Sequence, residues 1–529
     1  MSIDDWFLTG EQRGNPASRL PAWSEGNQVR VHVHGAAYFD RLVEVVAEMG
    51  DGDQLFFTDW RGDPDQRLRP DGPTVADLLS AAASRGVAVR GLVWRSHLDV
   101  LIYSAEQNRS LAEEITDDGG QVLLDQRVRR FGSHHQKLVV ARHPGRRERD
   151  VAFAGGIDLC HSRRDDATHL GDPQAVSMSP RYGDRPPWHD VQLELRGPVV
   201  AALDLTFRER WTDPTALRQG NPVAMLRDRL AGRPARGGPL PAPPDPPADC
   251  GPHAVQVLRT YPAKSRPYPY APHGERTVAL GYAKAIRRAR RLSYLEDQYM
   301  WSSQVAQLFA DALQANPDLH LIVVVPRHPD VDGRLALPPN MVGREHAIDV
   351  CRRADPDRVH VFDVENHAGT PVYVHAKVCV VDDVWASVGS DNFNRRSWTH
   401  DSELSCAVLD DTRDPRAPHD PAGLGDHART FARDLRLTLL REHLDRASDG
   451  RQDHDLLDPA DTVRAVGVAA EALDAWYRSG RRGPRPAGRL RRHDPVKLST
   501  FTRAWATPPY RLLYDPDGRP RRLRRTATW

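Results

Sequence analysis

Two histidine–lysine pairs occur in this sequence, each beside an apolar run. The phrase "SHHQKLVV" places His135 two residues before Lys137, and the phrase "VHAKVCVVD" places His375 two residues before Lys377. The chain contains only five lysines against 68 arginines, and with 23 histidines in 529 residues chance would give about 0.2 such pairs. We therefore interpret the two pairs as one functional element that occurs twice.

The chemistry of such pairs follows from their residue types. On a β-strand, residues i and i+2 point to the same face, so each pair offers an imidazole beside an ammonium group. Lysine is a poor neighbour for a metal cation but attracts phosphate. If the pairs meet, one histidine can attack a phosphodiester while the other protonates the leaving alcohol and then activates water. Because the lysines supply the charge stabilisation, the pattern predicts phosphodiester chemistry with no metal and no cofactor.

The elements that must position these pairs also repeat. In the first half, apolar runs at residues 54–61 and 87–94 enclose a helical stretch, and in the second half runs at residues 291–301 and 319–326 do the same. In each half, these runs are followed along the sequence by a histidine–lysine pair, then by a strand that ends in glycine, and then by a further strand. This alternation predicts the α/β class, with two sandwich repeats.

A Pro- and Gly-rich stretch, "GRPARGGPLPAPPDPPAD", separates the halves and predicts a flexible, partly extended linker. Two packing helices are predicted after the second half. Their apolar positions are Phe431, Leu435, Leu439, Leu440 and Leu444 in the first helix, and Val463, Val466, Ala470, Leu473 and Trp476 in the second. The expected organisation is a repeat at residues 1–231, a linker at 232–253, a second repeat at 254–447, and a C-terminal helix and tail at 448–529.

Charge is unevenly distributed along the chain. The net charge is +1, but residues 480–529 hold thirteen arginines and one lysine against three aspartates, an excess of +11. Such a basic tail can contact anionic lipid or nucleic acid. Alternatively, its aromatic and apolar residues can pack back onto the sandwich.

Several classes of protein are disfavoured. No run approaches ~20 uninterrupted apolar residues, so no membrane-spanning helix is expected. The N-terminus lacks the basic start and apolar run of a secretory signal. The five cysteines are scattered and odd in number, which indicates buried, reduced thiols. We therefore expect a cytoplasmic protein, peripheral at the inner membrane surface.

The residues around the pairs resemble the phospholipase D superfamily, whose signature joins a histidine, a lysine and an aspartate and is repeated twice. The second half fits in full, with Asp382 as the aspartate and "GSDNFNRRS" as the continuation. The first half resembles the eukaryotic enzymes in "GGIDLCHSRRD", "PWHDVQLELRGPVV" and "FRERW". The resemblance covers roughly residues 29–445. It implies two tandem phospholipase D-like α/β/α sandwich repeats that form a pseudo-twofold unit with one site between them.

The resemblance also implies roles for individual residues. The residues expected to act in catalysis are His135, Lys137, His375, Lys377, Asn392, Asp190 and Glu403. The two carboxylates among them would hold the far ring nitrogens of the histidines. The residues expected to contact substrate are Asp158, Ser390, Glu296, Gln298 and Tyr299. Asp382 would support a turn, and by analogy with relatives His135 attacks while His375 is the acid and base.

One position departs from the signature. Where the first aspartate is expected the chain has Arg142, followed by an inserted basic loop, "HPGRRERD". Asp150 is a candidate replacement for the aspartate, and the arginines of the loop can face either lipid phosphates or solvent. Asp158 stands where the second half has Asn392, as in eukaryotic relatives.

These features together predict a phosphodiesterase that hydrolyses a glycerophospholipid to phosphatidic acid and an alcohol through a phosphohistidine, with transfer to other alcohols as a related reaction. Its partner would be phospholipid at a membrane surface, and nucleic acid is disfavoured. The alternatives are a cardiolipin synthase-like phosphatidyltransferase, a nuclease of the same family that grips DNA through the tail and the arginine loop, and a binding module with a decayed first motif. Intact His135, Lys137 and Asp190 argue against decay.

Overall fold

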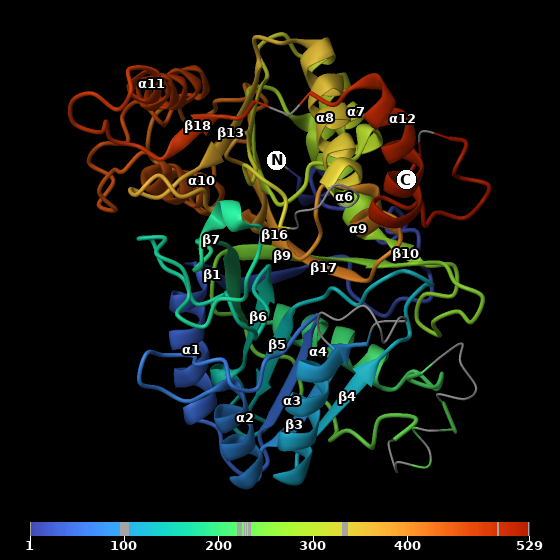
Figure 1. The fold of residues 1–529 in the computed structure, drawn as a ribbon. Coiled ribbons are helices and arrows are strands. Elements are labelled where there is room, and N and C mark those ends of the chain that lie inside the picture. The colour runs from blue at the N-terminus through green and yellow to red at the C-terminus, as the bar shows by residue number, and fades with distance from the viewer. Residues whose placement is uncertain are drawn as a thin grey trace.

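The computed structural model describes residues 2–95, 105–218, 225–226, 228, 230, 234–330, 337–494, 497–526 and 528–529. Its strands and helices alternate along most of the chain, which confirms the α/β class. In Figure 1 the N-terminal half, in blue to green, forms the lower part of the view, and the C-terminal half, in yellow to orange, forms the upper part.

The N-terminal half holds the first set of strands and helices. These are β1 (Ser24–Val33), α1 (Gly35–Ala47), β2 (Gln54–Asp59), α2 (Val75–Ser84), β3 (Ala88–Trp94), α3 (Ala105–Asp117), β4 (Gln121–Asp125), β5 (Leu138–Arg142), β6 (Val151–Gly155), β7 (Trp188–His189), β8 (Val191–Arg196) and α4 (Val199–Trp211). The predicted runs at residues 54–61 and 87–94 correspond to β2 and β3. Strand β5 begins just after Lys137, so the first pair lies at the entrance of its strand.

The C-terminal half and the tail hold the second set. These are β9 (His253–Tyr261), β10 (Glu275–Arg276), α6 (Thr277–Arg288), β11 (Leu292–Asp297), α7 (Ser303–Ala315), β12 (His320–Val324), α8 (Leu337–Ala354), β13 (Val359–Val364), β14 (Tyr373–Val374), β15 (Lys377–Val381), β16 (Trp385–Gly389), α9 (Arg395–Thr399), β17 (Glu403–Asp410), α10 (Thr430–His443), α11 (Pro459–Arg478), β18 (Leu490–Arg492) and α12 (Thr500–Pro509).

The two halves have the same strand order. The first runs β1-β8-β6-β5-β2-β3-β4, and the second runs β9-β17-β16-β15-β11-β12-β13 with β18 added at its edge. Strands β1 and β9 pair antiparallel, so one continuous sheet passes through both halves. Strand side chains alternate between the two faces of a sheet, so each half of the sheet has two faces to bury, and packed helices cover both of them. Helices α1, α2 and α3 cover one face of the first half, and α6, α7 and α8 cover one face of the second.

The opposite faces share one core. Side chains of α4, from the first half, and of α10 and α11, from the second, belong to the same cluster of buried apolar residues. The predicted stripe of α10 lies in this cluster, and so do Val466 and Ala470 of α11, whereas Trp476 is only half-buried and lies outside it. The halves are therefore joined by apolar packing as well as by strand pairing.

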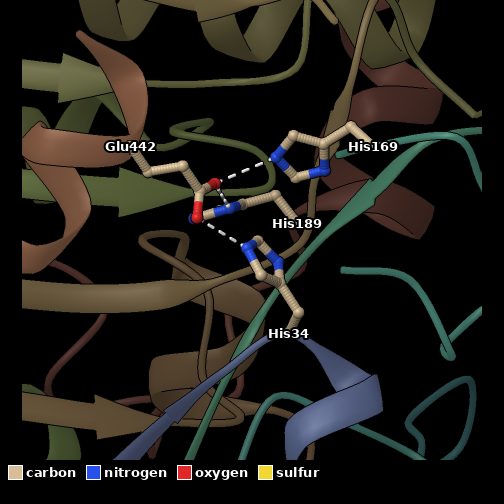
Figure 2. Close-up of side chains that lie close together, drawn as sticks. All are labelled: His34, His169, His189 and Glu442. Atoms are coloured by element: carbon tan, nitrogen blue, oxygen red, sulfur yellow. Dashed lines mark hydrogen bonds and ion pairs between the residues drawn. The ribbon is translucent and has the colours of Figure 1, made fainter. Parts of the chain in front are cut away.

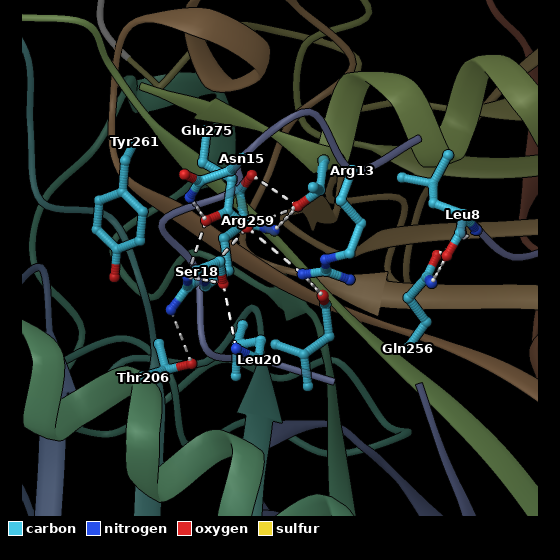
Figure 3. Close-up of polar contacts among 12 residues, drawn as sticks. Leu8, Arg13, Asn15, Ser18, Leu20, Thr206, Gln256, Arg259, Tyr261 and Glu275 are labelled. Atoms are coloured by element: carbon cyan, nitrogen blue, oxygen red, sulfur yellow. Dashed lines mark hydrogen bonds and ion pairs between the residues drawn. The ribbon is translucent and has the colours of Figure 1, made fainter. Parts of the chain in front are cut away.

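A buried polar network also joins the halves (Figure 3). The guanidinium of Arg259 on β9 donates to Glu275 at 2.8 Å and to Glu209 of α4 at 2.7 Å. Arg13 and Ser18 of the N-terminal segment contact the same network. Because each buried guanidinium faces a carboxylate, the network balances its own charge.

The linker is held on the surface by its carbonyl groups. Arg208 donates to the carbonyl of Pro241, and Trp211 donates to that of Gly238. Proline has no N–H but keeps its carbonyl, so a proline-rich segment anchors best as an acceptor. Four of the five cysteines are buried as expected, but Cys250, at the end of the linker, is exposed.

The C-terminal tail packs back onto the fold. Strand β18 pairs with β13, and the Tyr510 hydroxyl donates to the carbonyl of Trp301 at 2.6 Å. Tyr510 is buried together with Trp301 and Val342. Part of the basic tail is thus a structural element of the C-terminal half. Within the described residues, no helix has both the length and the apolar character needed to cross a bilayer.

Arg142, which replaces the first signature aspartate, is fully buried. It donates to Asp150 at 2.7 Å, to Asp204 at 3.1 Å and to the linker carbonyls of Pro244 and Asp245. Asp150 also accepts from the backbone of His143. Asp150 therefore partners the arginine and does not reproduce the contacts that Asp382 makes in the second half, described below.

We expect Arg142→Ala to lower the free energy of unfolding by about 3–5 kcal/mol, because buried Asp150 would lose its guanidinium partner and buried Asp204 would keep only Arg208. Urea denaturation followed by circular dichroism measures the change. The matched control is Arg147→Ala in the same loop, whose side chain is 48% exposed, and which should change stability by about 0.5 kcal/mol or less. Equal stability of the two variants would contradict this account of Arg142.

Candidate active site

The two histidine–lysine pairs meet at one cavity between the halves. His135 and His375 both line this cavity of about 670 Å³. The lysines lie behind the two histidines: Lys137 and Lys377 are buried and do not line the cavity. Each lysine donates to the carbonyl of the histidine two residues before it.

Each histidine is held by a carboxylate from the opposite half. Nδ1 of His135 lies 2.9 Å from Oε2 of Glu403, and Nδ1 of His375 lies 2.6 Å from Oδ2 of Asp190. With the Nδ1 proton donated to the carboxylate, the Nε2 lone pair of each ring is left free. Neither carboxylate can act on its histidine unless the two halves are docked.

Short backbone contacts explain why each histidine is paired with a carboxylate of the opposite half. The amide of His135 donates to the carbonyl of Ser402 at 2.9 Å, and the amide of His375 donates to the carbonyl of His189 at 2.7 Å. Ser402 and His189 directly precede Glu403 and Asp190. Parallel pairing of β14 with β7 extends the second contact. The backbone of each half thus aligns the carboxylate with the histidine of the other.

Removal from water governs the protonation of the site. Burial lowers the pKa of His135 well below its ordinary value, and Lys137 and Lys377 lower it further. Burial likewise lowers the pKa of His375, with Lys377 adding to the effect. Burial raises the pKa of Glu403 to about 8 and lowers that of Lys377 to about 8. Burial therefore favours the neutral forms of these four groups, and an anionic ligand would favour the cationic forms of the histidines and Lys377.

The other predicted residues fall into two groups. Asp158, Gln298, Tyr299 and Asn392 line the cavity. Asp158 lies 3.3 Å from the Lys137 ammonium group, and Gln298 accepts from Lys377 at 3.3 Å. The side-chain oxygen of Asn392 is buried and has no hydrogen-bond partner among the residues that the structure describes, so it is available to a polar group of a substrate.

Two of the predicted substrate contacts do not line the cavity. The Ser390 hydroxyl donates to Glu403 at 2.6 Å and accepts from the amide of Leu404, so it orients the carboxylate. Glu296 is buried beside His189 and His443, at 2.6 and 2.7 Å. Glu296 therefore belongs to a separate histidine cluster.

The signature aspartate supports a turn. Asp382, with a positive φ of 52°, accepts from the backbone amides of Arg290, Arg291 and Leu292 at 2.7–2.8 Å. These amides lead into β11, so the carboxylate fixes the start of that strand next to β15.

Sequence reasoning missed a cation and most of the aromatic wall of the cavity. Arg163 lines the cavity, stacks on the Trp188 ring at 3.9 Å and lies 3.6 Å from Asp158. The aromatic lining residues are Trp60, Trp94, Trp188, Tyr299, Trp301, Tyr373 and Tyr514. Trp94 ends β3 and Trp60 follows β2. Their position at strand ends is the sequence signal from which these two residues could have been predicted to line the site. The cavity thus combines aromatic surface with polar and charged side chains.

Comparisons with known proteins agree with this geometry. The family model "Phospholipase D" matches residues 65–324, and the model "Cardiolipin synthase, PLD-like domain" matches residues 284–414. Phospholipase D alpha 1 of Cynara cardunculus is 25% identical, over 72% of this chain and 60% of that protein. Phospholipase D alpha 2 of Arabidopsis thaliana is 24% identical, over 77% of this chain and 62% of that protein. The chain thus spans about three fifths of the length of these curated relatives.

Among solved structures, phosphatidylserine synthase of Haemophilus influenzae Rd KW20 is similar, with 13% identity, a TM-score of 0.49 and coverage of 72% of this chain and 82% of that one. The two family models together extend from residue 65 to residue 414 and include both histidine–lysine pairs. This chain belongs to the phospholipase D superfamily.

Proposed function

We propose that this chain is a phospholipase D-type phosphodiesterase that hydrolyses a glycerophospholipid to phosphatidic acid and an alcohol. The observation that carries the proposal is the pair of imidazoles in one cavity, each with its Nδ1 on a carboxylate. This arrangement leaves two Nε2 atoms available for reaction. Lys137, Lys377 and Arg163 are the cations nearby that suit an anionic phosphate.

The reaction would proceed in two displacements. Nε2 of His135 attacks phosphorus, the bond from phosphorus to the headgroup oxygen breaks, and protonated His375 gives its proton to that oxygen. His375 then takes a proton from water as the water oxygen attacks phosphorus and the N–P bond breaks. The phosphodiester anion itself raises the pKa of His375, which prepares this residue to act as the acid. The assignment of His135 as nucleophile rests on the family resemblance.

Two features favour a lipid over a nucleic acid. Seven Trp and Tyr side chains line the cavity among its polar residues, which suits an apolar substrate body beside a phosphate. The arginines of the basic loop are already engaged, since Arg146 pairs with Asp53, Arg147 with Asp245 and Arg149 with Glu48. The loop therefore offers no row of unpaired cations to a DNA backbone.

Exposed apolar side chains at the rim support contact with a membrane surface. Arg396 lines the cavity and donates to the carbonyls of Phe131 and Leu513. Phe131 is 45% exposed, and Leu512, beside Leu513, is 69% exposed. An apolar rim at the mouth of the cavity would enter the interfacial region of a bilayer.

A phosphatidyltransferase is the second candidate, favoured by the match of residues 284–414 to the cardiolipin synthase-type model. Both candidates share the phosphohistidine, and they differ in whether water or a lipid alcohol accepts the phosphatidyl group.

His135→Ala and His375→Ala should each lower turnover of a phosphatidylcholine substrate by at least about 10³-fold. The two histidines act in one mechanism, so loss of either one stops a step that the other cannot perform. Choline release measures turnover, and circular dichroism checks folding. The control is His367→Ala, which removes a histidine whose side chain is 60% exposed. Near-normal turnover in either of the first two variants would refute the mechanism.

Added ethanol should divert product from phosphatidic acid to phosphatidylethanol, because a covalent intermediate is open to either acceptor. Thin-layer chromatography of labelled lipid separates the products, with single- and double-stranded DNA as parallel substrates. Cleavage of DNA without lipid products would favour the nuclease. Product formed only when phosphatidylglycerol is present would favour the transferase.

The double variant Phe131→Ser and Leu512→Ser should bind anionic vesicles at least about threefold more weakly, since each side chain would lose apolar burial. Co-sedimentation with vesicles measures binding. The matched control is Val468→Ser on α11, 64% exposed, on a helix that lies away from α12 in Figure 1. Equal weakening by the control would exclude a specific role for the rim.

A further inference from the structure

Three histidines surround one carboxylate outside the catalytic cavity (Figure 2). Nε2 of His34 lies 2.7 Å and Nε2 of His169 lies 3.0 Å from the oxygens of Glu442, and Nδ1 of His189 lies 3.4 Å from the nearer one. The three histidines are buried, and none of the four residues lines the cavity. Glu442 belongs to α10, whereas the histidines belong to the N-terminal half, so the cluster lies where the halves join.

The outer partners of two rings determine where their protons lie. Nδ1 of His169 faces the carbonyl oxygen of Trp188 at 3.2 Å, and Nε2 of His189 faces Glu296 at 2.6 Å. A neutral imidazole carries one N–H, and this N–H lies on the nitrogen that faces a hydrogen-bond acceptor at such a distance. In their neutral forms both rings present a lone pair toward Glu442, which is the arrangement that a shared metal ion requires.

The candidate ligand atoms lie close enough together that a transition-metal ion could bind between them after small side-chain shifts, since the histidine nitrogens lie 2.7–3.4 Å from the Glu442 oxygens. The four candidate atoms all lie within 4.8 Å of one another. A tetrahedral zinc site with bonds of about 2.0–2.1 Å separates its ligand atoms by roughly 3.3 Å. Three imidazole nitrogens with one carboxylate favour zinc or a related ion over Mg²⁺ or Ca²⁺, which prefer oxygen ligands. A divalent ion would also balance the charges of Glu442 and Glu296.

The surroundings of the cluster are those of a metal site. A carboxylate behind His189 and a carbonyl behind His169 are the usual outer partners of metal-bound histidines, because they fix the tautomer and the ring orientation. His34 and His169 also have positive φ values of 69° and 53°. Such conformations are uncommon outside glycine and persist where the surrounding structure demands them.

We propose that His34, His169, His189 and Glu442 bind a structural divalent transition-metal ion, with zinc as the best fit. The ion would tie α10 of the second half to the end of β1 and to β7 of the first. Because Asp190 directly follows His189, the ion would also fix the segment that presents Asp190 to His375. Its role is to position this segment, and no step of the phosphodiester chemistry passes through it.

Metal analysis of the full chain tests the proposal. The protein is produced in zinc-supplemented medium and purified through a tag that binds no metal. Plasma mass spectrometry should find about one zinc per chain. Glu442→Gln and His34→Gln should each lower the bound zinc at least about tenfold. The control His367→Gln, at an exposed histidine, should retain it.

A second measurement does not depend on how the variants fold. Removal of the ion from the wild-type chain with dipicolinate should lower the melting temperature by several degrees, and Zn²⁺ or Co²⁺, but not Mg²⁺, should restore it. The Co²⁺ form should show the intense visible absorption of a tetrahedral site. A wild-type chain that binds no zinc and is not stabilised by it would overturn the proposal, and two imidazolium rings would then hold Glu442. Zinc retained in full by folded Glu442→Gln and His34→Gln would overturn it as well.

Discussion

The pairing of each histidine with a carboxylate from the other half is the interaction on which the candidate active site depends. His135 is oriented by Glu403 and His375 by Asp190, over separations of 268 and 185 residues. Neither half alone contains a histidine with its partner. The shared apolar core, the pairing of β1 with β9 and the Arg259 network all hold the halves in the one arrangement that completes both contacts.

Burial makes this arrangement chemically effective. In water, a lone imidazole and a lone ammonium group would be solvated and weakly coupled. In the cavity, loss of water favours neutral histidines and lowers the pKa of Lys377. Electrostatic interactions are stronger in such surroundings. A phosphate that binds there would therefore shift the charges of these groups, beside the aromatic side chains that line part of the cavity.

The scarcity of lysine acquires a structural explanation. Arginine partners many of the buried carboxylates outside the histidine clusters, as where Arg436 makes two bonds of 2.6 Å to Asp383. Its planar guanidinium suits bidentate contacts and stays charged. Lysine occupies both histidine pairs, where its compact ammonium group contacts the carbonyl of the paired histidine, and burial lowers the pKa of Lys377 to about 8. Arg142 is a further example, because an arginine stands where the signature has its first aspartate, and it pairs with two buried carboxylates, Asp150 and Asp204.

The sequence by itself determined the α/β class, the repeated order of strands and helices, and the two histidine–lysine pairs, because these follow from local periodicity and spacing. It also indicated which carboxylates serve the histidines, through the resemblance of "PWHD" and "DSEL" to the family. Only the tertiary structure decided that Asp190 serves His375 and Glu403 serves His135, that Glu296 faces His189 and His443, and that three histidines meet at Glu442. The physical reason is distance along the chain: neighbouring residues fix which way a side chain points on its strand, whereas the docking of two sheets fixes which side chains it meets.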